Sequence, residues 1–409
     1  MDTLNLFICL AWRNLWRNGR RTLLTMVAII LAVASMVSLG SFMTAWNNST
    51  LDVTIENLTG HIQIHAPGYL DDPNIEHSMA PINADLKAYL QAAPVIAWSE
   101  RVRLPAMIRT ERESSPVELL GINPAAELGL SFISGAVVQG HYFNDAHERG
   151  ILIGKTLMDR LQTKAGRRVV VMSQGINGQI RELGTPVVGV FRGAPEMERS
   201  VAFITLPRAQ NMMGLGSHYF EISLKVDDTE ALPEVVKALQ KRAPELDIRA
   251  WDELQPFTKA MLEMSEGSIL IWILVSFSVV AFGLVNTLLM AVYERMREFG
   301  LLQALGMRPG WLLLQVLLES LMLVGAATLA GLLVGALIVL GYQDGLDLGS
   351  WGSGATYFGA SSVLYPKLVW EELLYIGTVV LVLGVLASLY PAYRASRYVP
   401  VEVLNKAIN

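Results

Sequence analysis

The residues of this chain that could do chemistry form a few short clusters, and none has the spacing of a catalytic or metal-binding motif. The segment Gly154–Thr156 has the ending of a phosphate-binding loop, but Arg149 stands where that motif needs its first glycine. His61 and His65 fall on one face of a predicted strand about 13 Å apart, too far to bind one metal ion. We therefore predict no catalytic residue, no metal site and no cofactor in this chain, whose energy source must be another polypeptide.

A charged segment, Glu294–Met307, lies between two long apolar runs. The run before it, Ser268–Val292, has no charged residue, and the run after it, Trp311–Tyr342, has only Glu319. Each run is long enough to span a bilayer as a helix. The segment between them therefore predicts a short amphipathic helix against one membrane face, a lever on which a cytoplasmic motor can act. Three arginines are expected to point outward: Arg295, Arg297 and Arg308. Three leucines are expected to point inward: Leu301, Leu302 and Leu305.

Composition supports a membrane protein. Hydrophobic residues make up 52% of the 409 positions and charged residues only 17%, with a mean hydropathy of +0.39. The mean hydropathy is high, and the charged fraction low, for a soluble domain. The apolar residues are concentrated in four blocks long enough to span: Leu23–Trp46, Ser268–Val292, Trp311–Tyr342 and Leu373–Tyr390.

The basic residues predict the orientation of these spans. They gather before the first block, between the second and third, and after the fourth, whereas residues 343–372 hold one lysine against four acids. Because loops rich in lysine and arginine stay in the cytoplasm, both termini and Glu294–Met307 are predicted to be cytoplasmic. The large segment 47–266 and the loop 343–372 would lie on the other side.

The N-terminal residues 5–21 form a separate unit, in which Trp12 and Trp16 alternate with arginines. This pattern is typical of a helix in the headgroup layer before the chain enters the bilayer. The first apolar block is too long for a cleaved signal and is interpreted as an anchor. The single cysteine, Cys9, leaves no possibility of an internal disulfide.

The large hydrophilic segment predicts a mixed α/β fold, as one elongated domain or two lobes. Alternating or β-branched runs predict strands, and apolar spacing predicts helices. The strands are expected at His61–His65, Val117–Ile122, Arg168–Met172, Thr185–Phe191, Val201–Thr205 and Tyr219–Val226, and the helices at Lys155–Leu161, Leu206–Met213 and Leu232–Arg242.

Three stretches resemble one family of membrane permeases. Glu294–Met307 is similar to a coupling-helix signature with a charged E-R-x-R-E-x-G opening followed by an A-L-G turn. Ala11–Leu24 resembles the family's arginine-rich opening, and Tyr390–Leu404 resembles its ending, with a proline-alanine pair and a Pro-x-Glu-x-Leu close. The chain is thus identified as a member of the permease family of MacB, FtsX and the lipoprotein-releasing Lol transporters.

The resemblance implies a membrane α-helical protein with four transmembrane helices and a large α/β extracytoplasmic domain inserted between helices 1 and 2. The implied parts are an amphipathic N-terminal helix at 1–22, transmembrane helices at 23–46, 267–292, 311–342 and 371–390, a MacB-like periplasmic domain at 47–266, a cytoplasmic coupling helix at 293–310, a periplasmic loop at 343–370 and a cytoplasmic tail at 391–409.

The resemblance also implies mechanotransmission. Two copies of a separate ABC ATPase, which bind ATP and Mg, would dock on Glu294–Met307 and move the extracytoplasmic domains through the spans. A second permease subunit, identical or different, would complete a dimer in the inner membrane. Other expected partners are membrane lipid and a lipoprotein, or a periplasmic chaperone or adaptor; no nucleic acid is expected.

Two external stretches, Gly60–Pro73 and Phe191–Met213, resemble the lipoprotein-releasing branch of the family. Release of lipid-anchored substrates from the outer leaflet is therefore the favoured function. Efflux of amphiphiles or peptides by a MacB-like permease with a periplasmic adaptor, and FtsX-like signalling, stay open as alternatives.

Several residues are assigned roles on this basis. The family signature implies contact with the ATPase for the following: Glu294, Arg295, Arg297, Glu298, Gly300, Leu301, Leu305 and Gly306. Glu319 inside a span is either functional or paired with a loop arginine. Gly331 and Gly335 predict close helix packing and a seam between subunits, and Asn286 predicts a hydrogen bond between helices.

Overall fold

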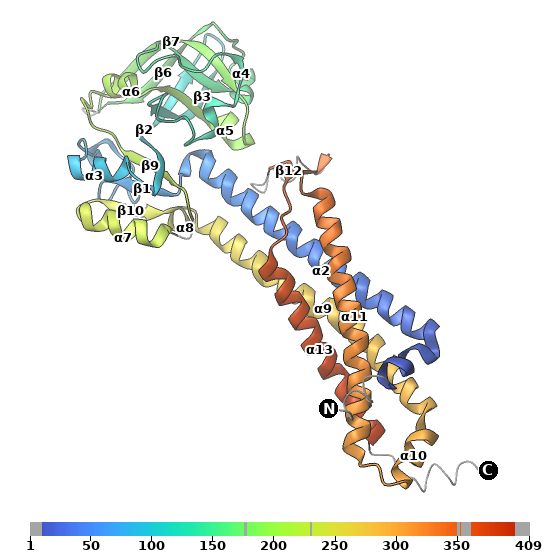
Figure 1. Cartoon of the computed structure of the whole chain (residues 1–409). Helices are drawn as coiled ribbons and strands as arrows, with labels where there is room; N and C mark the ends of the chain where they lie inside the picture. The colour runs from blue at the N-terminus through green and yellow to red at the C-terminus, as the bar shows by residue number, and fades with distance from the viewer. Residues whose placement is uncertain (1–9, 176–177, 230, 350–351, 353–360, 397–409) are drawn as a thin grey trace. The chain divides into compact units, whose positions relative to one another are not determined.

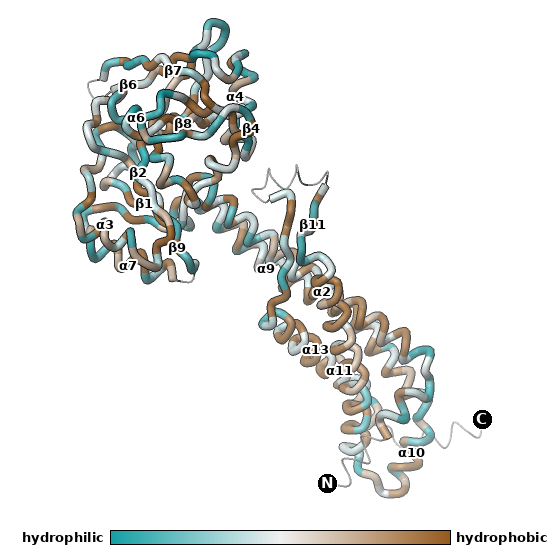
Figure 2. Tube along the Cα trace, turned by 45° about the horizontal axis from the view of Figure 1, so that its top comes forward, coloured by the Kyte–Doolittle hydropathy of each residue, from teal (hydrophilic) through white to brown (hydrophobic). Residues whose placement is uncertain are grey.

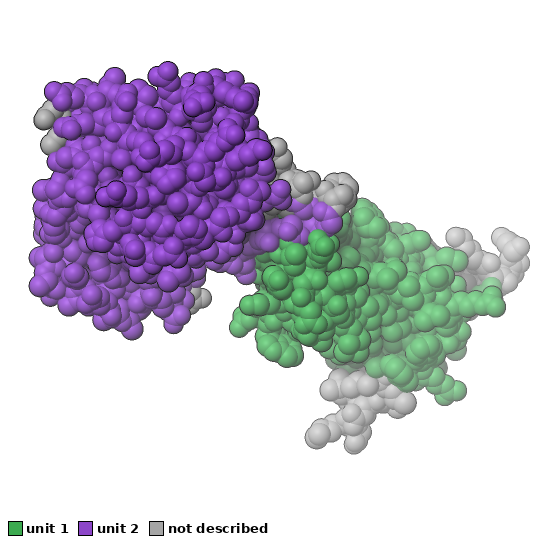
Figure 3. All heavy atoms as spheres, turned by 90° about the horizontal axis from the view of Figure 1, so that it is seen from above, with its two compact units in different colours: residues 1–47, 262–347, 363–409 green, residues 48–261, 348–362 purple. Residues whose placement is uncertain are grey.

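The computed structural model describes residues 10–175, 178–229, 231–349, 352 and 361–396. It divides into two compact units, which are coloured separately in Figure 3. Unit 1 comprises residues 1–47, 262–347 and 363–409, and unit 2 comprises residues 48–261 and 348–362. Predictions on Cys9, on part of the loop 343–370 and on the end of Tyr390–Leu404 lie outside the described residues.

Unit 1 is built on four helices that are long and apolar enough to cross a membrane. Their sequences are apolar on all sides rather than on one stripe, which is typical of helices surrounded by lipid or by other helices. Figure 2 shows hydrophobic residues along α2, α11 and α13. The four helices, labelled in Figure 1, are α2 (Gly19–Thr54), α9 (Pro256–Glu294), α11 (Pro309–Tyr342) and α13 (Trp370–Ser396).

Shorter elements complete unit 1. A helical start at Leu10 leads into α2 through the 3-10 turn η1 (Trp16–Asn18), and α10 (Met296–Ala304) connects α9 to α11. The strands β11 (Leu346–Asp347) and β12 (Val363–Leu364) pair with each other. The four-helix prediction is confirmed.

Two glycines let α11 approach α2. A Cβ built on Gly331 would lie 2.7 Å from the Cβ of Val33, and one on Gly335 would lie 2.7 Å from the Cβ of Val37. Real side chains do not come this close, so only glycine permits the contact. The predicted seam between two subunits at this pair is wrong, because α2 of the same chain already occupies it.

The predicted hydrogen bond of Asn286 between helices is also wrong. Asn286 lies on an exposed face of α9, and its side chain makes no hydrogen bond within the described residues. The neighbouring Thr287 forms the link instead, with its Oγ1 atom 3.1 Å from Oγ1 of Thr25 on α2.

Unit 2 is organised around one ten-stranded mixed sheet, in the order β10-β1-β9-β2-β3-β8-β5-β7-β4, with β6 pairing to β2 and β7. The pairs β3–β8 and β5–β7 are parallel and the others antiparallel. The strands are β1 (Ile62–His65), β2 (Val95–Arg109), β3 (Ser114–Ile122), β4 (Val137–Gly140), β5 (Ile151–Gly154), β6 (Arg168–Gln174), β7 (Ile180–Phe191), β8 (Val201–Thr205), β9 (Glu221–Val226) and β10 (Asp247–Ala250).

Short helices accompany the sheet of unit 2. They are η2 (Ile55–Thr59), η3 (Ile75–His77), α3 (Ala84–Leu90), η4 (Phe132–Ser134), α4 (Lys155–Arg160), α5 (Pro195–Ser200), α6 (Leu206–Met213), α7 (Leu232–Arg242) and α8 (Trp251–Leu254). The predicted strand at Val201–Thr205 and the predicted helices at Leu206–Met213 and Leu232–Arg242 are confirmed to the residue.

A fully buried arginine connects separate parts of unit 2. Arg101 of β2 forms ion pairs with Glu127 at 2.7 Å and with Glu221 of β9 at 3.0 Å, and it donates a hydrogen bond to the carbonyl of Leu58. Arg103 bonds to the second oxygen of Glu221 at 3.1 Å. A buried charge is tolerated only when it is paired and hydrogen-bonded, as here. This network joins four parts of the chain: Leu58 of η2, strand β2, Glu127 and strand β9.

Buried His61 makes the stability of unit 2 depend on pH. Its Nδ1 atom accepts a hydrogen bond from the Val226 N–H at 3.0 Å, which requires the neutral ring. Burial, with a smaller contribution from the positive charge of Lys225, lowers the pKa of His61 to about 4. Between that pKa and about 6.5 the unfolded chain binds a proton that the folded chain does not.

We therefore predict that unit 2 loses stability as the pH falls from about 6.5 towards 4, by up to about 3 kcal/mol from this residue. The measurement is the apparent melting temperature of the full chain in one detergent across this pH range. His61→Asn, whose oxygen can accept the same hydrogen bond without titrating, should show a flatter dependence. An identical pH dependence in both proteins would contradict the role of His61.

Candidate coupling site around α10

The chain reverses direction at α10 within a short segment. Helix α9 ends at Glu294, Arg295 caps α10, and α11 begins with Pro309 in its first turn, where proline needs no hydrogen-bond partner. Gly306, just after α10, has a φ of 95°, a left-handed conformation that favours glycine. This glycine of the predicted signature therefore has a local structural role in the turn.

Helix α10 packs on the bundle through Phe299 and Gly300, both of which are buried. Phe299 belongs to a cluster with residues of α9, α11 and α13: Val292, Leu312, Val316, Ala392 and Ala395.

This orientation turns the leucines away from the bundle. Leu301 is 63% exposed, Leu305 is 76% exposed, and Leu302 is also exposed. The prediction that these leucines point inward is therefore wrong, because one aromatic side chain, Phe299, fills the inward position.

The prediction that Arg295 points outward is also wrong. Its Nη1 atom lies 2.8 and 3.0 Å from the two carboxylate oxygens of Glu319 on α11, and both side chains are less than 10% exposed. The Nη2 atom of Arg295 donates to the main-chain carbonyl of Asn14 at 2.9 Å. Asn14 in turn donates from Nδ2 to Glu319 at 2.7 Å. Glu319 was expected either to be functional or to pair with a loop arginine. The structure shows the ion pair, with Arg295 as the partner.

We name Arg295, Glu319 and Asn14 the buried node. It joins three chain segments: the N-terminal segment Leu10–Asn18, the cap of α10, and α11. A single unpaired charge buried at this position would destabilise the fold. Here each of the three residues forms a hydrogen bond or ion pair with the other two.

Two exposed ion pairs surround the buried node. Arg17 lies 2.8 Å from Glu298, and Arg21 lies 3.1 Å from Glu294. Asn18 adds a hydrogen bond of 2.6 Å to Glu294. Both acidic groups of the predicted ATPase-contacting segment therefore bind the start of this same chain.

The sequence contained a signal for this arrangement that our interpretation missed. Asn14, Arg17, Asn18 and Arg21 are three or four positions apart and so share one helix face. Their spacing along the chain matches that of the two acids Glu294 and Glu298. The alternation of tryptophan and arginine in residues 5–21 predicts a headgroup-layer helix and a basic flank, and neither interpretation includes ion pairs with α10.

The side chains left exposed on α10 form a mixed surface, which we name the outer α10 face: Arg297, Leu301, Leu302 and Leu305. Within the described part of the chain, Arg297 makes no ion pair or side-chain hydrogen bond. Exposed leucines beside an unpaired arginine are typical of a protein interface.

The buried node makes a prediction about stability. Glu319→Ala leaves Arg295 buried without a counter-charge and should destabilise the protein by about 3–5 kcal/mol. Arg17→Ala, which breaks an exposed pair, should cost less than about 1 kcal/mol. The apparent melting temperature in one detergent is the measurement.

A double variant provides the control. Replacing both charges with apolar groups, Arg295→Met with Glu319→Leu, should recover most of the stability lost in Glu319→Ala. Equal destabilisation by Glu319→Ala and Arg17→Ala would contradict the buried node.

Comparison with known families places these features in context. Residues 22–242 match the MacB-like periplasmic core domain family, and residues 270–400 match the FtsX-like permease C-terminal family. The first match covers more than half of the chain. Together with the four apolar helices, these matches define a transmembrane permease of the ABC transporter class. The chain belongs to the family of such permeases that carry a MacB-like periplasmic core domain.

Individual relatives include two branches of that family. The lipoprotein-releasing system transmembrane protein LolC of Neisseria meningitidis serogroup B is 24% identical, with 95% of each chain covered. The corresponding LolE of Haemophilus influenzae is 22% identical over 97% of this chain and 98% of its own. The macrolide export ATP-binding/permease protein MacB of Nitrobacter winogradskyi is 28% identical over 62% of this chain and 38% of its own length.

Proposed function

We propose that the chain is the permease subunit of a mechanotransmission ABC transporter that extracts lipoproteins or other lipid-anchored substrates from the outer leaflet of the inner membrane. ATP hydrolysis takes place in a separate ATPase. The observation that carries the proposal is the match, over nearly the whole length of both chains, to transmembrane proteins of lipoprotein-releasing systems. An apolar groove between α2 and α9 is the proposed site for the lipid anchor.

The groove has the chemistry that an acyl chain needs. Its volume is about 720 Å³, and both α2 and α9 contribute its walls. Leu24, Leu31, Val279 and Met290 line it and are all exposed, so the groove is open to the surroundings of the helices.

The groove runs along residues 21–35 of α2 and 276–290 of α9, from the middle of these helices towards their ends beside α10. In the proposed topology, an acyl chain anchored in the outer leaflet would therefore enter sideways between the spans and meet the groove with its end, at Ser35, Ser276 and Val279.

The outer α10 face is the proposed seat of the ATPase. Because Glu294, Arg295 and Glu298 bind within the chain, docking falls to Arg297 and the exposed leucines. The buried node then passes the motion of α10 to α11 and to the N-terminal segment.

The proposed topology follows the distribution of basic residues. Both termini and α10 lie in the cytoplasm, and the α/β unit, inserted between α2 and α9, lies in the periplasm. Two ATPase copies bind ATP and Mg, and a second permease subunit, identical or different, completes the dimer. The further partner is a lipoprotein, or a periplasmic chaperone or adaptor.

A second candidate function is MacB-like efflux of amphiphiles or peptides with a periplasmic adaptor, favoured by the similarity to MacB. FtsX-like signalling is a third, favoured by the match of residues 270–400. Both use the same ATPase seat. Efflux differs from the first proposal in its substrate and in its periplasmic adaptor, whereas signalling moves no substrate.

Docking on the outer α10 face gives a prediction. Leu301→Glu with Leu305→Glu should lower the affinity for the co-encoded ATPase at least tenfold, because two apolar contacts become charged. Co-purification and ATP turnover in nanodiscs provide the measurements. Arg17→Ala, outside this face, is the matched control. Wild-type ATPase binding by the double glutamate variant would contradict the seat.

The groove gives a separate prediction about the substrate. A photoreactive amino acid at Val279, which lines the groove, should crosslink to a triacylated lipoprotein, and ATP turnover should change when that lipoprotein is added. The same probe at Leu337 of α11, exposed but not in the groove, should crosslink much less. Equal crosslinking at both positions would remove the lipoprotein proposal while leaving the permease assignment intact.

A further inference from the structure

Strand β2 of unit 2 has an unpaired edge in the middle of the sheet. On one side it pairs with β3 along Arg101–Arg109. On its other side, β9 pairs only as far as Arg101, and β6 pairs only from Met107 onward. Among the residues that the structure describes, none forms a strand beside residues 102–106 on that side.

The main-chain groups of Arg103 point into this gap. In a strand, alternate residues direct their N–H and C=O groups to the same side. The carbonyl of Arg101 accepts from Phe220 beside β9, and the carbonyl of Pro105 accepts from Ser173 of β6. Arg103 lies between them and shares their side. No described side chain forms a hydrogen bond with its main-chain N–H or C=O.

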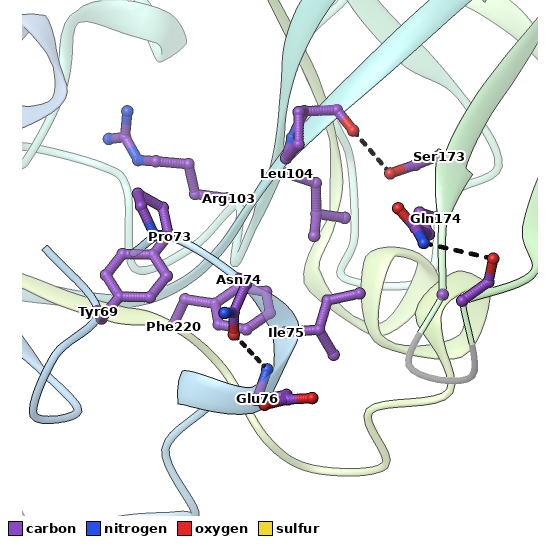
Figure 4. Close-up of a pocket in the computed structure, with 13 residues that line it drawn as sticks. Tyr69, Pro73, Asn74, Ile75, Glu76, Arg103, Leu104, Ser173, Gln174 and Phe220 are labelled. Carbon is purple, nitrogen blue, oxygen red and sulfur yellow. Dashed lines mark hydrogen bonds between the residues drawn. The ribbon is translucent and has the colours of Figure 1, made fainter. Parts of the chain in front are cut away.

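A cavity of about 360 Å³ occupies the gap (Figure 4). Leu104, Ile75 and Phe220 provide apolar wall, and Ser173 and Gln174 provide polar groups on the β6 side. The gap from Arg101 to Met107 measures about 20 Å along the strand, at about 3.4 Å per residue. This leaves room for a short extended segment of polypeptide.

The walls of the cavity are held in place by independent contacts. The rings of Tyr69 and Phe220 stack with centroids 5.6 Å apart. Above them, the Arg103 guanidinium is held by Glu118 at 3.0 Å and by Glu221 at 3.1 Å, so that it does not turn into the gap. Preformed walls of this kind are typical of a binding site.

We propose that this gap binds an extended polypeptide segment by strand addition. One residue of the ligand exchanges two hydrogen bonds with Arg103, and an apolar side chain packs against Leu104 and Ile75. The carboxylate of Glu76 at the cavity wall, which makes no ion pair in the described chain, favours a ligand with a basic residue nearby. This site goes beyond the proposed transport reaction: it needs no ATPase, so each proposal can fail alone.

The first test asks whether the main-chain amides of the ligand make the contact. The probe is a fluorescein-labelled, terminally blocked pentapeptide of alternating valine and lysine, titrated into the purified full chain in detergent. Two further peptides carry N-methyl groups on all valine amides or on all lysine amides. Strand addition predicts that only one of them loses affinity, by about tenfold or more, since only one set of amides faces Arg103. If both or neither lose affinity, the main chain is not what binds and the proposal is overturned.

The second test asks whether the peptide still binds when the cavity is filled by a larger side chain. Ile75→Trp fills it and should abolish binding of the unmethylated peptide, whereas Leu128→Trp, an exposed leucine elsewhere in unit 2, should not. Near-ultraviolet circular dichroism checks that both variants are folded. Wild-type affinity in a folded Ile75→Trp variant would overturn the proposal.

Discussion

The arrangement of the helix bundle around α10 depends on one buried ion pair, Arg295 with Glu319. Two opposite charges in an apolar bundle must stay together, because separating them leaves an uncompensated charge in a place without water. Asn14 completes the pair by bonding to both members. The N-terminal segment is thereby held against the start of α10 and against α11, which lie 281 and 305 residues further along the chain.

This constraint divides the α10 region into two surfaces with different roles. The inner surface, with Phe299 and the buried node, joins α10 to the bundle. The outer α10 face is left with exposed leucines and with Arg297, which has no ion-pair partner in the described part of the chain. A part that must receive force from a partner and transmit it to helices needs both properties: a firm inner attachment and a free outer contact.

The sequence was sufficient for the parts of the fold that follow from local patterns. Four apolar runs of spanning length and several short strands and helices were predicted because each pattern repeats within one segment. The 15-residue strand β2 was missed. Its arginines, Arg101 and Arg103, broke the apolar alternation, and only the partners Glu127 and Glu221 explain them.

The coupling site around α10 was less predictable because its contacts, like those of Arg101 and Arg103, join residues far apart in the sequence. The charged segment was located from sequence, but the direction of each side chain was not, since it depends on partners far along the chain. Arg295 points inward because Glu319 is there, and the leucines point outward because Phe299 takes the inner position. The small-residue pair Gly331 and Gly335 indicated close packing without saying which helix would be the neighbour.

The most direct test of this account asks whether the N-terminal segment and α10 move as one body. With Cys9 replaced by serine, cysteines at Asn18 and Glu294, whose side chains now touch at 2.6 Å, would be joined by a short bismaleimide in the assembled transporter. ATP turnover would then be measured before and after crosslinking. The account predicts unchanged turnover, because the two segments keep their contact throughout the cycle. Loss of turnover in the crosslinked sample, with the uncrosslinked cysteine pair still active, would mean that they separate and would contradict it.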